Sequence, residues 1–72
     1  MYYVRDQFVQ EKKNGVNKIA AVIDADTFTD LPAYNECKGV DGELTVGTVA
    51  LVADECCFYS LTSSGTWNKK ED

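Results

Sequence analysis

The C-terminal third of the chain carries the pattern that most restricts the fold. Residues 48–54 and 57–62 are two short runs rich in apolar and aromatic side chains, and residues 66–69 can return as a third strand. The connection at residues 54–56 is short enough to force antiparallel pairing of the first two runs. This third of the chain is therefore expected to form an antiparallel meander of three strands.

Alternation along residues 57–62 assigns the side chains of that run to the two faces of a sheet. One face receives Cys57, Tyr59 and Leu61, and the other receives Phe58, Ser60 and Thr62. Trp67 ends the meander and is expected to cap the core, and the alternative is an exposed aromatic anchor for a partner.

The N-terminal part predicts a hairpin. Residues 2–12 interleave aromatic and β-branched side chains with polar ones, and residues 17–24 hold an apolar run from Ile19 to Ile23. Asn14-Gly15 lies between them, and this pair favours a type I′ turn because both central residues need positive φ. The apolar run alternates little, which predicts a strand that is covered on both faces.

The middle of the chain predicts little regular structure. Residues 24–32 allow one short helical turn, with Asp26 or Thr27 as its cap and Pro32 beyond its end. Residues 33–47 form an irregular connection with a brief strand near 43–46. Together these features predict one mainly β domain over residues 1–72: an N-terminal hairpin (about 2–24), an irregular connection (about 25–47) and a C-terminal meander (about 48–69), with fraying over the last residues.

The charge of the chain argues against two classes of partner. Its 72 residues include 7 basic and 12 acidic side chains, for a net charge of −5. Nucleic acids and anionic membranes attract basic surfaces, so neither is an expected partner. The N-terminus lacks the pattern of a signal peptide, so we expect a cytoplasmic or virion location.

The residues with reactive side chains do not form a catalytic or metal-binding pattern. The chain has three cysteines (Cys37, Cys56 and Cys57) and no histidine, so it offers neither a complete disulfide framework nor a base to activate a thiol. The acidic spacing that starts at Asp24 suggests calcium but departs from an EF-hand loop at Phe28. We therefore expect a non-enzymatic protein with no metal and no cofactor.

The order of four segments resembles small structural proteins of tailed phages and prophages. These segments are Asp30-Leu31-Pro32, Gly47-Thr48-Val49-Ala50-Leu51-Val52, Phe58-Tyr59-Ser60-Leu61 and Ser64-Gly65-Thr66-Trp67. In such proteins the pattern belongs to a β-meander on a head-fibre, decoration or tail-associated component. Cys56-Cys57 departs from the polar turn that these proteins usually have. The resemblance implies a scaffold and no catalytic residues.

The expected function is therefore a structural or protein-interaction module of a virion, with other virion or host proteins as partners and a homo-oligomer as a further option. The residues expected to form the interaction surface are Tyr2, Tyr3, Tyr34, Tyr59 and Trp67. The alternative is a small carbohydrate- or ligand-binding module, in which Trp67 and Tyr59 stack on a sugar ring and Asn68 accepts its hydrogen bonds.

Overall fold

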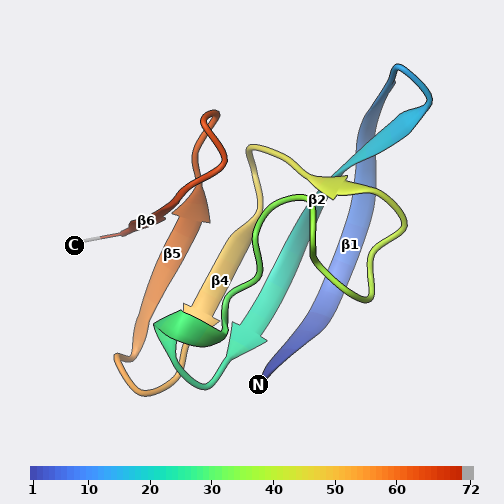
Figure 1. The fold of residues 1–72 in the computed structure, drawn as a ribbon. Helices are drawn as coiled ribbons and strands as arrows, with labels where there is room; N and C mark the ends of the chain where they lie inside the picture. The colour runs from blue at the N-terminus through green and yellow to red at the C-terminus, as the bar shows by residue number, and fades with distance from the viewer. Residues whose placement is uncertain (71–72) are drawn as a thin grey trace.

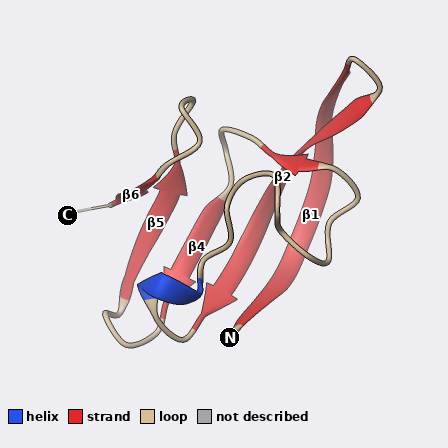
Figure 2. Ribbon diagram, viewed as in Figure 1, coloured by secondary structure: helices blue, strands red, loops and turns tan. Residues whose placement is uncertain are grey.

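The computed structural model describes residues 1–70, which form one mixed β-sheet with a single short helical turn (Figures 1 and 2). The elements are β1 (Tyr2–Lys13), β2 (Val16–Ala25), η1 (Phe28–Asp30), β3 (Glu43–Leu44), β4 (Val49–Val52), β5 (Cys57–Leu61) and β6 (Trp67–Lys69). The strand order is β1-β2-β4-β5-β6, and β3 pairs with β2. The mainly β class is thus confirmed. The fraying expected at Glu71 and Asp72 lies outside the described residues.

The N-terminal hairpin forms where the sequence predicts it. Asn14 and Gly15 have φ values of 53° and 81°, as a type I′ turn requires. The tip of the hairpin projects beyond the rest of the sheet (Figure 1). The register of β1 on β2 shifts twice, between Val4 and Asp6 and between Val9 and Glu11. Each shift is a bulge, so β1 presents an interrupted outer edge.

The C-terminal meander also forms as expected, with β4-β5 and β5-β6 both antiparallel. Tyr59 and Leu61 lie on the buried face and Phe58 on the opposite one, which confirms the predicted alternation. Cys56 is not part of a strand. It lies in the turn between β4 and β5 with a φ of 52°, so its side chain does not alternate with that of Cys57.

A parallel pair of strands joins the N-terminal hairpin to the C-terminal meander. The prediction of these two antiparallel units does not specify how they pair with each other. β2 and β4 lie side by side and run in the same direction, with Val22 opposite Val49 and Ala25 opposite Val52. Parallel neighbours need a crossover connection, and residues 26–48 provide it. Thr48 secures the joint because its buried hydroxyl donates to the Ile19 carbonyl and accepts from the Ala21 amide.

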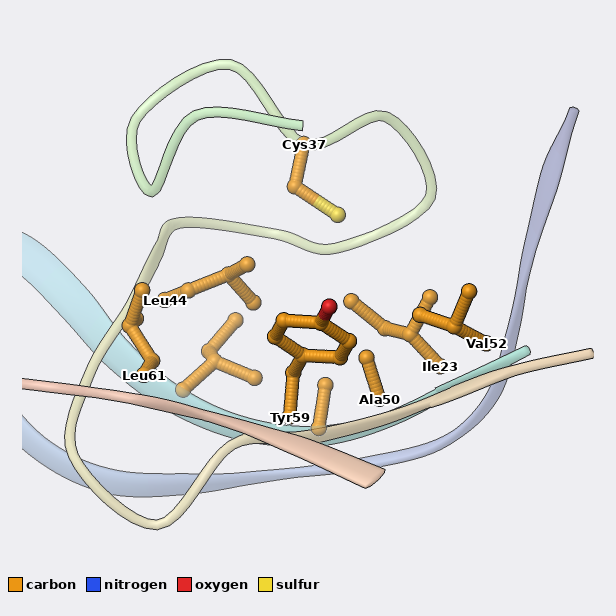
Figure 3. Close-up of a cluster of buried hydrophobic side chains, with 9 residues drawn as sticks. Ile23, Cys37, Leu44, Ala50, Val52, Tyr59 and Leu61 are labelled. Carbon is orange, nitrogen blue, oxygen red and sulfur yellow. The ribbon is translucent and has the colours of Figure 1, made fainter. Parts of the chain in front are cut away.

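The crossover connection covers one face of the sheet, and the core lies between them. Figure 3 shows the core side chains rising from the sheet toward the loop that carries Cys37. The buried cluster consists of Ile19, Ala21, Ile23, Cys37, Leu44, Ala50, Val52, Tyr59 and Leu61. Trp67 packs against this cluster, and its indole nitrogen donates to the Pro32 carbonyl at 2.9 Å. Its expected role as a cap of the core is confirmed.

Candidate interaction surface

The second face of the sheet has no covering layer among residues 1–70. Strand register places three rows of side chains on it, and we call these rows the open face. Tyr3, Asp24, Leu51 and Phe58 form the first row, Asp6, Val22, Val49 and Ser60 the second, and Phe8 with Ala20, which is buried, the third. Because side chains alternate along each strand, these residues point away from the core described above.

The aromatic residues of the open face are its most exposed apolar side chains. Tyr3 is 66% exposed, Phe8 55% and Phe58 52%. Val22, Val49 and Leu51 lie between them and are only partly buried. Single exposed apolar side chains are ordinary, but a contiguous group of this kind marks a contact site.

The electrostatics of the open face are dominated by one ion pair. Arg5 donates to a single Asp24 carboxylate oxygen from both Nε (3.0 Å) and Nη2 (2.6 Å). Asp6 accepts a hydrogen bond from the Gln7 amide. Lys70 follows β6, and its amide donates to the Phe58 carbonyl, so this basic residue lies beside the first row. The charges near the open face therefore come close to cancelling.

An apolar hollow continues the first row at the end of the sheet nearest the N-terminus. It encloses about 410 Å³, and its walls include Tyr3, Asp24, Leu51 and Ala53. Tyr3 on β1 and Leu51 on β4 flank the hollow. Asp24 on β2 lies between these two residues in the sheet. A shallow apolar depression beside exposed aromatic rings is a suitable receptor for an aromatic side chain.

The structure separates the five residues that the sequence suggested as an interaction surface. Tyr3 alone of the five belongs to the open face. Tyr2 packs against the core, and its hydroxyl accepts a hydrogen bond from the Lys38 amide at 2.7 Å. Tyr34 is 37% exposed and lies against Gly65, where an added Cβ would approach its ring to 2.8 Å. Trp67 is half-buried in its contact with the core.

Tyr59 is buried, so its ring cannot be part of a contact surface. Its exposure is 8%, its ring lies 4.8 Å from that of Phe28, and its hydroxyl donates to Glu55 at 2.8 Å. Asn68 is opposite Ser60 and so points to the open face, whereas Trp67 packs on the core side. The residues suggested for sugar stacking are therefore not brought together.

Sequence reasoning missed Phe8, Leu51 and Phe58 as surface residues. The signal for Phe58 was present, because alternation places it opposite Tyr59. The signal for Phe8 was weaker, because the bulges in β1 interrupt a strict alternation. Residue type alone favours tyrosine and tryptophan as contact residues, and it does not single out Phe8, Leu51 or Phe58.

Glu55 organises a polar cluster at the other side of the sheet. Hydrogen bonds from Tyr59 and from Lys69 hold the pKa of the Glu55 carboxyl below its usual value, and the ammonium of Lys69 lies 3.3 Å from it. The same contact with Glu55 raises the pKa of the Tyr59 hydroxyl. This cluster ties β6 to the turn after β4 and is a structural contact.

The cysteines are free thiols in three different settings. Cys37 is buried, Cys57 is half-buried and Cys56 is exposed. Burial raises the pKa of both Cys37 and Cys57. A raised pKa lowers the thiolate fraction, so neither thiol is activated as a nucleophile.

The acidic side chains near η1 are engaged in local contacts. Asp24 is paired with Arg5, and Asp30 accepts from the Thr27 amide and pairs with the amino group of Met1. Within residues 1–70 no three His, Cys, Asp or Glu side chains are placed to hold a metal ion. No helix in this part of the chain is long and apolar enough to cross a membrane.

Comparison of this chain with protein-family models, with curated proteins and with solved structures finds no match. The geometry of the surface and the sequence resemblance are therefore the two sources from which a function can be proposed.

Proposed function

We propose that this protein is a non-enzymatic interaction module that forms part of, or attaches to, a phage or prophage particle. The open face carries this proposal, because a small acidic chain keeps Tyr3, Phe8 and Phe58 exposed on one side of its sheet, around partly buried aliphatic side chains. Soluble proteins tolerate such a surface when a partner covers it. The virion setting rests on the sequence resemblance to phage structural proteins. Four segments carry it: Asp30-Leu31-Pro32, the two strands at residues 47–52 and 58–61, and Ser64-Gly65-Thr66-Trp67.

The geometry favours contact over chemistry. The hollow beside Tyr3 is open, and so is another hollow, whose walls include Lys18, Tyr34, Thr45, Thr62 and Ser64. General acid–base catalysis needs titratable groups that converge on a substrate within a pocket. The cluster around Glu55 is instead satisfied by its own neighbours, Tyr59 and Lys69.

The first test is mass spectrometry of particles purified on a density gradient after prophage induction in the source organism. Co-purification of this chain with capsid or tail proteins in stoichiometric amount is the expected result. Recovery of the chain only in the soluble fraction, while complete particles form without it, would overturn the proposal.

Two variants sharpen this test. Tyr3→Glu places a charge on the open face and is expected to remove the chain from the particles. Val9→Glu is the matched control: Val9 is 56% exposed, on the same strand, and its register partner Ile19 places it on the opposite side. Equal loss of both variants from the particles would show that the open face is not the contact.

A further inference from the structure

We infer that a second copy of this chain covers the open face, in a two-fold dimer that packs sheet against sheet. In this dimer Phe58 of each copy enters the apolar hollow between Tyr3 and Leu51 of the other. The inference names the first partner of the proposed interaction module, and so it rests on that proposal. Four features of the described residues support it.

The outline of the molecule allows an interface of the size that a stable dimer needs. The molecule measures 36 × 22 × 17 Å, and its broad side is that of the sheet (Figure 1). An outline of 36 by 22 Å limits the projected area of this side to roughly 800 Å², which is about the area that each partner buries in an interface of standard size. Two such sheets stacked face to face also restore the layered core that a single sheet lacks on this side.

The strand order supplies a self-complementary arrangement. β4 is the middle strand of the order β1-β2-β4-β5-β6, so a two-fold axis along β4 places β5 of one copy over β2 of the other. Phe58 and Asp24 occupy the same row on β5 and β2. Phe58 of one copy therefore faces the hollow above Asp24 of the second copy, and the reverse contact follows by symmetry. Leu51 meets its own counterpart at the axis.

Charge also favours a second copy at this face. The chain has a net charge of −5, so two copies repel unless they meet through a surface that is close to neutral. On the open face Arg5 neutralises Asp24. The same two-fold axis places Lys70, at the β6 edge, over Tyr3 on β1 of the second copy. The charges at this contact thus come close to cancelling within each copy.

The outer edge of β1 is less suitable for pairing with another strand. Its ladder is interrupted by the two bulges, and its outer part carries Lys12 and Lys13. Bulges and lysines are features with which proteins block edge-to-edge association. The β1 edge is therefore a poorer site for a second copy than the broad face.

Sedimentation equilibrium on the full chain over a wide range of concentration tests the inference. The native protein is expected to be a dimer that dissociates on dilution. Phe58→Glu is expected to raise the dissociation constant by roughly thirtyfold or more, as loss of a central aromatic anchor does. Val9→Glu adds the same charge at equal exposure on the opposite side and is expected to leave the dissociation constant unchanged.

Circular dichroism of each variant establishes that it is folded, and Tyr3→Glu replaces Phe58→Glu if the latter is not. A native chain that stays monomeric at every concentration overturns the inference, as does a dimer that survives both open-face substitutions. If the native chain is monomeric but Phe58→Glu still removes it from particles, a different protein covers the face. In that case the second-copy inference fails and the proposed function stands.

Discussion

The two faces of the sheet are made from the same strands, and they differ in what lies over them. Along β4, Ala50 and Val52 are fully buried, whereas Val49 and Leu51 are only partly covered. The residue types of the two sets are alike. The difference comes from the crossover connection, which lies over one face and leaves the other open (Figure 3). Apolar character alone therefore does not decide which side of this sheet becomes the core.

The largest expected effect comes from disturbing the cover of the core face at Gly42. Gly42 has a φ of 153°, and an added Cβ would lie 2.3 Å from the Asn17 carbonyl oxygen. Gly42→Ala is expected to lower the free energy of unfolding by roughly 3 kcal/mol, since backbone strain and overpacking add. Urea denaturation measures the loss.

Gly15→Ala is the control for Gly42→Ala. Gly15 also has a positive φ, but nothing lies within 4 Å of its added Cβ, so only the conformational cost of about 1 kcal/mol is expected. Equal losses of stability in the two variants would mean that Gly42 is not in close contact with Asn17 of β2.

The second prediction compares two valines of one strand that point to opposite faces. Val52→Ala is expected to cost about 2 kcal/mol of stability, because Val52 is fully buried and its lost methyl groups leave a cavity. Val49→Ala is expected to cost less than about 1 kcal/mol, since its side chain is only partly buried in the monomer. Urea denaturation at low protein concentration makes the comparison. Equal losses of stability in the two variants would contradict the distinction between a covered and an open face.

The third prediction concerns the bond that holds the connection onto the meander. Trp67→Phe removes the indole donor from the Pro32 carbonyl and is expected to cost about 1–2 kcal/mol. Thermal and urea unfolding both report it. Tyr34→Phe is the control, because no hydrogen bond of its hydroxyl contributes to this contact. An unchanged stability of Trp67→Phe would show that water replaces the indole hydrogen bond without cost.

The smallest expected effect is a change in how stability depends on pH. The Tyr59 and Lys69 contacts lower the pKa of Glu55 in the folded state. The resulting stabilisation is present above the ordinary glutamate pKa of about 4.3 and is lost as the pH falls through the lowered value. Glu55→Gln should flatten this acid limb of a plot of melting temperature against pH. Glu36→Gln, on the exposed part of the connection, should leave the limb in place, and an unchanged limb in Glu55→Gln would contradict the assignment.

The elements themselves could be predicted because their signals are local. Asn14-Gly15 fixes the first turn by its φ preference, and the short turn before Cys57 fixes antiparallel pairing of β4 with β5. The short turn at Phe28–Asp30 ends before Pro32 for the same kind of local reason. The candidate surface was predicted less well: Tyr3 belongs to it, but Tyr59 is buried and Phe58 takes the exposed position.

The strands, their turns and the alternation of side chains follow from local sequence, because each depends on residues within a few positions of one another. The parallel pairing of β2 with β4 arises only when the chain folds, since it joins residues separated by the whole crossover connection. The same long-range choice placed the connection over Ile23 and Val52 and left Val22 and Val49 on the open side. The face of a strand that becomes buried depends on the segment that packs against it, and the sequence of the strand does not specify that segment.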